Sequence, residues 1–112
     1  MVMQMGESSK ETEAVKLLLS FDPIPERREA YFHYVLGEFV PTLEYLGLKM
    51  CEAWHTAYGP YPLRLTGFVA PDQATMDSIL SSKDFRELEE RLQEYVMNYH
   101  RRIVPVRSSF QF

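Results

Sequence analysis

The sequence predicts an α+β domain whose elements follow the order βαββαβ and whose four strands form one antiparallel sheet. Three observations support this fold class. Apolar residues alternate with a period of two in four segments, recur at helical spacing in two regions between them, and are separated by Pro- and Gly-containing turns. The chain has 112 residues, 46% of them hydrophobic and 25% charged, which is enough for a single ordinary core.

The first predicted strand covers residues 14 to 21 and ends at Asp22-Pro23. Its alternating apolar positions are Val15, Leu17, Leu19 and Phe21. Residues 1 to 12 are polar and acidic and show no periodicity. We therefore expect a flexible N-terminal tail over residues 1–12, followed by a single domain over residues 13–112.

The first helix is predicted from about Pro25 to Leu46. Its inward face consists of apolar residues three or four positions apart, namely Phe32, Val35, Phe39, Leu43 and Leu46. Pro41 lies inside this segment, and its ring would crowd the carbonyl of Gly37, so a kink is expected. Gly47 suits the left-handed residue that ends a helix.

The next two strands, residues 48–58 and 63–70, flank the turn sequence Gly59-Pro60-Tyr61-Pro62 and are predicted to form a hairpin. Asp72 is a suitable N-cap for a short helix. Asp84 and Glu87 form a possible capping box for the following helix, whose inward residues are Phe85, Leu88, Leu92, Tyr95 and Val96. Asn98 is expected to end this helix before a fourth strand from Tyr99 to about Arg107.

This order of elements is the ferredoxin-like, or split βαβ, arrangement. Its two helical layers can cover only one face of the sheet. The first and third strands are apolar on both faces, and we assign Leu18 and Phe68 to the second face. In so short a chain a second copy must cover that face, so a homodimer is expected.

The segments WHTAYGPYP at residues 54 to 62 and DFRELEERLQEYV at residues 84 to 96 add a family likeness. Together with the order of elements, they resemble the dimeric α+β barrel superfamily, and within it the NIPSNAP-type and antibiotic-biosynthesis-monooxygenase-like proteins, over about residues 14 to 107. Trp54, Thr56 and Gly59 fit the NIPSNAP pattern, whereas Ala57 replaces its acidic residue and Phe68 its second Trp. The resemblance implies that two sheets pair into a shared barrel. Some of the family's members bind small aromatic or haem-like ligands. No catalytic residue is carried over.

Several classes of chemistry find no support in the sequence. The single cysteine, Cys51, is about 13 Å along one strand from His55, so the two cannot form a nucleophilic pair, and Cys51 is expected to be a small buried residue. The three histidines, His33, His55 and His100, lack metal-ligand spacing, and no glycine-rich phosphate loop is present. We therefore expect no metal and no cofactor.

Charge and hydropathy bear on partners and location. Twelve Lys and Arg against sixteen Asp and Glu give a net charge of −4, which disfavours nucleic acid. The first residues do not resemble a signal peptide, and no run of about 18 apolar residues occurs. With one cysteine and no disulfide, a cytoplasmic protein without membrane contact is expected.

The order βαββαβ is also that of RNA-recognition domains, so RNA binding is a remote alternative. Residues 66 to 70, TGFVA, supply only the Gly-Phe step of the basic-Gly-aromatic-small-aromatic pattern in their third strand. Arg101, Arg102 and Arg107 can contact phosphate, but charge on an edge strand is a commoner reason for them.

Clustered aromatic residues suggest a ligand cavity between the first helix and the hairpin. Its predicted lining is Tyr31, Tyr34, Trp54, His55 and Tyr58. In the alternative interpretation, Tyr31, Tyr34 and Tyr45 lie at a dimer or helix–sheet boundary with their hydroxyls in water.

The favoured function is a dimeric module that binds a small apolar or aromatic ligand, or a protein whose role is assembly itself. The alternative is a cofactor-independent monooxygenase or isomerase acting on a phenol- or quinone-like substrate, with His55 as the catalytic base.

Overall fold

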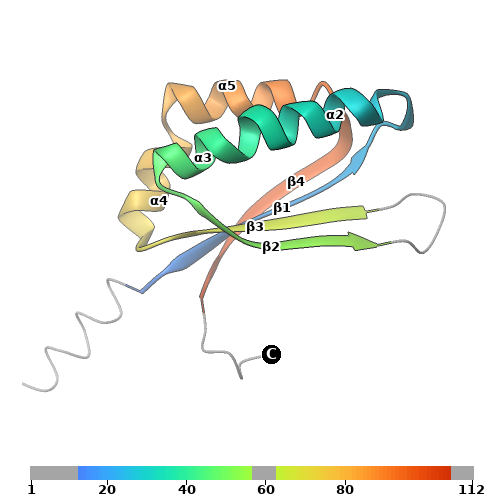
Figure 1. Cartoon of the computed structure of the whole chain (residues 1–112). Coiled ribbons are helices and arrows are strands. Elements are labelled where there is room, and N and C mark those ends of the chain that lie inside the picture. The colour runs from blue at the N-terminus through green and yellow to red at the C-terminus, as the bar shows by residue number, and fades with distance from the viewer. Residues whose placement is uncertain (1–12, 57–62, 107–112) are drawn as a thin grey trace, which may run out of the picture.

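The computed structural model describes residues 13–56 and 63–106, which form a four-stranded antiparallel sheet with helices packed against it (Figure 1). The strand order across the sheet is β2-β3-β1-β4. The strands are β1 (Val15–Pro23), β2 (Lys49–Thr56), β3 (Leu63–Ala70) and β4 (Val96–Pro105). This architecture confirms the predicted fold class and the order βαββαβ.

The connection from β1 to β2 is a run of helical segments, and two further helices connect β3 to β4. The first run comprises η1 (Pro25–Arg27), α2 (Arg28–Tyr34), η2 (Val35–Phe39) and α3 (Val40–Leu46). The second comprises α4 (Gln73–Leu80) and α5 (Lys83–Leu92). In the described part of the chain all these helices lie on one face of the sheet and leave the other face uncovered (Figure 1). Within the same residues, no helix is long and apolar enough to cross a membrane.

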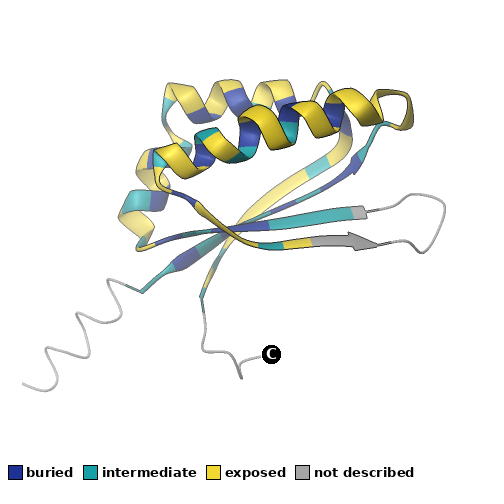
Figure 2. Ribbon diagram, viewed as in Figure 1, coloured by how far each residue is buried: buried dark blue, intermediate teal, exposed yellow. Residues whose placement is uncertain are grey.

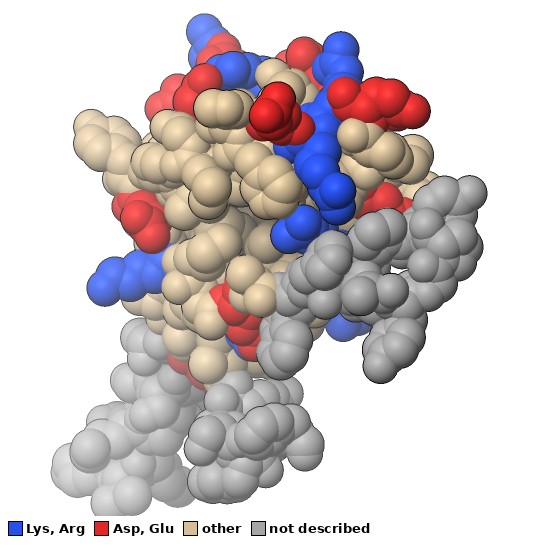
Figure 3. Space-filling view, turned by 45° about the vertical axis from the view of Figure 1, so that its right-hand side comes forward, with Lys and Arg blue, Asp and Glu red and all other residues tan. Residues whose placement is uncertain are grey.

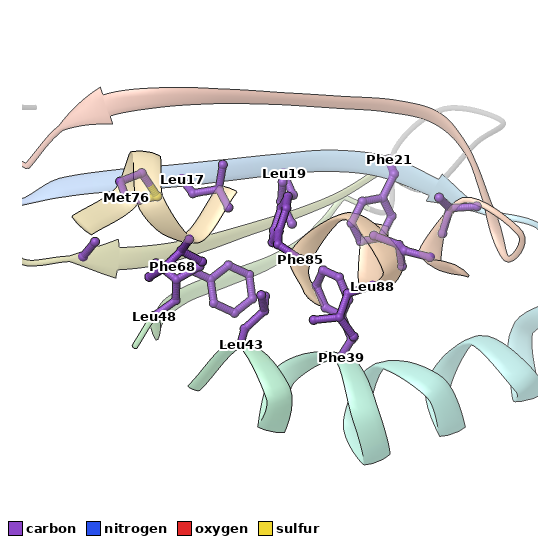
Figure 4. Close-up of a cluster of buried hydrophobic side chains, with 14 of the residues drawn as sticks. Leu17, Leu19, Phe21, Phe39, Leu43, Leu48, Phe68, Met76, Phe85 and Leu88 are labelled. Carbon is purple, nitrogen blue, oxygen red and sulfur yellow. The ribbon is translucent and has the colours of Figure 1, made fainter. Parts of the chain in front are cut away.

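The hydrophobic core lies between the sheet and its helical layer (Figures 2 and 4). Strands β1 and β3 and all the longer helices contribute to it. The largest fully buried side chains are Phe21, Phe68, Phe85, Leu17, Leu19, Leu43, Leu48, Met76 and Leu92. In β1 the buried residues alternate with half-buried ones, as the period-two pattern predicted.

The first helical run buries a different face from the one predicted. Tyr31 and Tyr34 are buried, whereas Phe32 is 37% exposed and Val35 is half-buried. The cause is η2, a π-helical turn in which the N–H of Val40 donates to the carbonyl of Val35, five residues earlier. This wider turn adds one residue to the helical run. The buried residue before Phe39 is therefore Tyr34, five positions earlier, and not Val35, four positions earlier.

Pro41 explains why the wider turn forms here. Proline has no N–H, and in a regular α-helix its ring would collide with the carbonyl of Gly37. A π-helical turn just before Pro41 lets the helical run continue without that collision. The irregularity expected at Pro41 is therefore present, and it takes the form of a widened turn.

The predicted faces of the sheet are half correct. The register pairs Leu17 with Phe68 and Leu18 with Gly67, so Phe68 shares the helix-covered face with Leu17 and is fully buried there. Leu18 lies on the uncovered face, as predicted, and Phe68 does not. Because both strands are apolar on both faces, their alternation alone could not specify this register. Phe68 also has no free ring face for stacking on a base, as RNA recognition would need.

The helix caps and the start of β4 differ in detail from the prediction. Asp72 caps α4 by accepting a hydrogen bond from the N–H of Thr75 at 2.7 Å, as expected. The cap of α5 is Ser82, whose hydroxyl accepts from the N–H of Phe85 at 3.1 Å, rather than Asp84. Asn98 lies inside β4 at φ 57°.

Candidate functional site

Tyr34, one of the predicted ligand-binding residues, belongs to the core. It is 3% exposed, and its hydroxyl donates a hydrogen bond to the carbonyl of Leu88 at 2.7 Å. Its ring stacks on Tyr95 at 5.3 Å between centroids, and the guanidinium of Arg91 lies 4.8 Å from the ring centroid. Burial raises the pKa of the Tyr34 hydroxyl. The described neighbours thus occupy both its hydroxyl and its ring, whereas Tyr45 is 88% exposed, as the alternative interpretation expected.

Tyr31 is also buried, in a small aromatic group beneath α2. Its ring meets Phe21 edge-on at 5.9 Å and Phe32 at 5.1 Å. Arg64 on β3 lies against the same group, 5.9 Å from the Tyr31 centroid and 5.1 Å from that of Phe32. The Nε of Arg64 and the hydroxyl of Thr66 are buried and have no hydrogen-bond partner among the described residues. Both residues lie on the helix-covered side of β3, as Phe68 does.

The other predicted residues of the aromatic cavity are Trp54, His55 and Tyr58. Tyr58 lies outside the described residues, as do the side chains of Trp54 and His55. The backbone register pairs Trp54 with Leu65 and His55 with Arg64. The proposed roles of these three residues therefore remain predictions.

The uncovered face of the sheet carries a hollow of about 350 Å³, which we call the sheet-face hollow. Its lining comes from β1, β3 and β4 and consists of Leu18, Ser20, Leu65, His100, Arg101 and Arg102. The register explains this grouping, because two adjacent rows of residues cross the sheet here. One row is Gly67, Leu18 and Arg102, and the next is Leu65, Ser20 and His100. The second row has the small residue Ser20 at its centre, which leaves room above the sheet.

Gly67 allows an ion pair to pass over the middle of the uncovered face. Lys16 on β1 contacts Glu52 on β2 at 2.8 Å, across the intervening strand β3. A Cβ atom on Gly67 would lie 3.1 Å from Oε1 of Glu52 and 3.3 Å from both Leu18 and Lys16. The hydrogen bond that Lys16 donates to Glu52 raises the pKa of Lys16. The charges of Lys16 and Glu52 therefore compensate each other beside the hollow.

Arg101 and Arg102 point to opposite faces of the sheet. Arg101 contacts Glu89 at 3.2 Å, and its guanidinium lies 5.5 Å from the ring centroid of Phe85 on the helical side. The hydroxyl of Tyr99 donates to the same carboxylate at 2.6 Å. Arg101 belongs to the lining of the hollow although its guanidinium lies on the helical side. The side chain of Arg102, paired in register with Leu18, lies on the uncovered face.

A second, more open hollow of about 380 Å³ lies on the outer side of α2 and η2. It is lined by Glu29, Phe32, His33, Leu36 and Gly37, and Leu36 is 69% exposed. Elsewhere over the helical layer, acidic and basic side chains lie among one another (Figure 3). Such a mixed surface is typical of solvated helices.

Cys51 does not have the environment expected of it. It is exposed, at the register shift of β2 between Met50 and Glu52, rather than buried. Although the residue is exposed, partial loss of water around its sulfur raises the pKa of the thiol, which disfavours the reactive thiolate. In the described parts of the chain, no three His, Cys, Asp or Glu residues are grouped as metal ligands would be.

Comparisons with known proteins identify the class of fold. The structure is similar to an uncharacterised NIPSNAP-like domain protein from Burkholderia xenovorans, with a TM-score of 0.65 and 12% identity over 90% of each chain. It is also similar to a NIPSNAP family protein from Agrobacterium tumefaciens, with a TM-score of 0.62 and 14% identity over 87% of this chain and 89% of the other.

A further similar structure is hydroxynitrile lyase from Passiflora edulis, with a TM-score of 0.66 and 11% identity over 88% of this chain and 98% of the lyase. No family model and no curated protein matches the sequence. The chain therefore has the α+β fold of the NIPSNAP-type proteins and their structural relatives, as the sequence resemblance predicted. At these identities the likeness establishes the fold alone.

Sequence reasoning did not identify the sheet-face hollow. Ser20, Leu65, His100 and Arg102 are far apart in the chain and were not grouped. The available signal was one small residue, Ser20, inside an otherwise bulky strand. Only the register shows that these residues lie in adjacent rows.

Proposed function

We propose that the protein is a homodimer formed through the uncovered sheet face, and that the sheet-face hollow binds a small, mostly apolar ligand. The observation that carries this proposal is a hollow of about 350 Å³ whose floor includes Leu18 and Leu65. Ligand pockets are commonly of about 300–1,000 Å³, apolar, and furnished with a few polar groups. Ser20 and His100 supply such groups here.

Support for the dimer comes from the distribution of apolar residues on the two faces of the sheet. The helices cover one face, and the other carries half-buried aliphatic residues on three strands: Leu18, Leu65, Val69 and Val104. Burying such a patch against a second copy is favourable, and a two-fold axis lets one patch serve both subunits. Face-to-face pairing is also what the resemblance to dimeric α+β barrels implies.

Light scattering at micromolar concentration tests the dimer. We expect twice the 13.2 kDa chain mass for the wild type. Leu18→Arg should give aggregated or unfolded protein, because it places an unpaired charge in the interface. Leu36→Arg is the matched control, since Leu36 is exposed on the outer side of η2, and it should leave the dimer intact. A well-folded wild-type monomer would contradict the proposal.

Ligand binding is tested with a neutral aromatic probe, 2-naphthamide, by ligand-observed NMR. Ser20→Leu fills the hollow from its centre and should abolish binding, while Ser78→Leu, at an exposed position on α4, should not. Binding that survives Ser20→Leu unchanged would place the ligand elsewhere. The enzymatic alternative with His55 as base stays a prediction, because the side chain of His55 lies outside the described residues.

A further inference from the structure

We propose that the ligand of the sheet-face hollow is an amphipathic anion: a small aromatic or aliphatic carboxylate whose charged group binds Arg102. The apolar body of the ligand would lie on Leu18 and Leu65. This inference rests on the proposed function and adds to it the charge and the orientation of the ligand.

The first argument is the charge of the lining. The side chains that line the hollow on the uncovered face are two aliphatic residues, one hydroxyl, one imidazole and one guanidinium. None of these lining residues is acidic. The nearby carboxylate of Glu52 already accepts a hydrogen bond from Lys16 at 2.8 Å. An anion entering the hollow therefore meets a positive group whose charge is not balanced by the lining.

The second argument is that Arg102 lines the hollow and, unlike its neighbour Arg101 and unlike Arg91, has no carboxylate partner among the described residues. Arg91 binds Glu38 through two nitrogens, at 2.6 and 3.2 Å. Arg101 binds Glu89. Arg102 also lies beside a cavity, yet forms no ion pair in residues 13–56 and 63–106. Its planar guanidinium can bind a carboxylate with two parallel hydrogen bonds.

The third argument is the polarity of the hollow from one strand to the next. Arg102 and His100 are on β4, Leu65 is on β3, and Leu18 and Ser20 lie between them on β1. The polar donors thus line one side and an aliphatic residue the other. A ligand with a charged head and an apolar body matches this order when the head lies toward β4, with the Ser20 hydroxyl and the His100 imidazole as further donors.

The fourth argument comes from enclosing the hollow in the proposed dimer. Covering Arg102 with a second sheet removes water from its guanidinium, which is costly for an unpaired charge. A bound carboxylate offsets that cost, since it supplies the opposite charge at hydrogen-bonding distance. A neutral ligand of the same shape would leave the guanidinium unpaired.

The test compares two probes of nearly equal size and shape, 2-naphthoate and neutral 2-naphthamide, by titration calorimetry at pH 7 on the full chain. The variants are Arg102→Gln, the conservative Arg102→Lys, and the matched control Arg86→Gln at an exposed position on α5. Light scattering on each variant verifies that its oligomeric state equals that of the wild type.

We expect the wild type and Arg86→Gln to bind the carboxylate about tenfold or more tightly than the amide. Arg102→Gln should bind the two probes equally, and Arg102→Lys should keep part of the preference. Equal affinities for the two probes in the wild type would contradict the proposal that the ligand is an anion bound by Arg102. A preference for the carboxylate that survives Arg102→Gln would contradict it too. Both outcomes leave the proposed function in place. If the wild type binds neither probe at millimolar concentration, the proposed ligand site and the proposed anion are both overturned.

Discussion

At the scale of single residues, position along the first helical run decides what each tyrosine does. Tyr34 and Tyr45 are both in this run, yet one is 3% and the other 88% exposed. Of these two tyrosines, only Tyr34 has a hydroxyl that donates to a buried main-chain carbonyl, that of Leu88 on α5. This bond connects α2 to α5 within the helical layer that lies over the sheet.

Tyr34→Phe should therefore lower the free energy of unfolding by about 1–2 kcal/mol, because the Leu88 carbonyl loses a buried donor. Tyr45→Phe, which makes the same chemical change at an exposed site, should have almost no effect. Urea denaturation followed by circular dichroism measures both. Equal effects of the two substitutions would mean that the Tyr34 hydroxyl makes no net contribution.

Asp72 gives the stability a specific pH dependence. Hydrogen bonds from Thr75 hold the pKa of this carboxyl below its usual value in the folded chain. A lowered folded pKa stabilises the fold at pH values above the unfolded pKa of about 3.9, and the contribution is lost as the pH falls through the folded pKa.

The melting temperature of the wild type should therefore exceed that of Asp72→Asn by a constant amount above about pH 5, and this gap should close as the pH falls below about 3. Differential scanning calorimetry across this range gives the answer. A gap that does not change with pH would show that the charge of Asp72 plays no part in the cap.

At the scale of elements, the π-helical turn η2 sets the phase of the first helical run. It brings Tyr31 and Tyr34 onto the same inward face as Phe39, in place of Phe32 and Val35. The extra residue and Pro41 depend on each other, since a regular turn would set the proline ring against the carbonyl four residues before it.

Deleting Gly37, which is exposed and has no atom near its would-be Cβ, removes the extra residue. Alone, this deletion should destabilise the fold by about 3 kcal/mol, because Pro41 then lies in a regular helix. Combined with Pro41→Ala, it should cost much less, since a regular helix still presents Tyr34 and Phe39 on one face. Chemical denaturation of the single and double variants tests the coupling, and the absence of rescue would contradict it.

At the scale of the whole molecule, the uncovered sheet face combines aliphatic residues with an excess of positive charge. Lys16 and Glu52 compensate each other, while Lys49 and Arg102 carry no described ion pair. In the proposed dimer the same charges of two copies approach each other across the interface. This repulsion opposes the attraction between the apolar surfaces.

The dimer should consequently tighten with salt, its dissociation constant falling severalfold between about 0.05 and 0.5 M NaCl as the repulsion is screened. Arg102→Gln removes one of the repelling charges and should reduce this dependence. Sedimentation equilibrium measures the dissociation constants. A dissociation constant that rises with salt would instead indicate complementary charges across the interface.

The sequence by itself determined the class of fold, because the periods of two and 3.6 are local properties of the chain. The alternation of Val15, Leu17, Leu19 and Phe21 was enough to predict β1 and its buried face. Asp72 and Gly47 likewise marked helix ends correctly, since capping depends on neighbours within a few residues.

Only the tertiary structure decided which residues meet across the sheet and which face of the first helix is buried. The predicted face of Phe68 is wrong because its strand is apolar on both faces. For such a strand, the alternation of residues does not specify the register. Tyr31 and Tyr34 face the core because η2 contains one extra residue. A regular spacing of 3.6 residues per turn does not predict such a turn. The sheet-face hollow follows from that same register, because Ser20, Leu65 and His100 lie side by side only once the strands are paired.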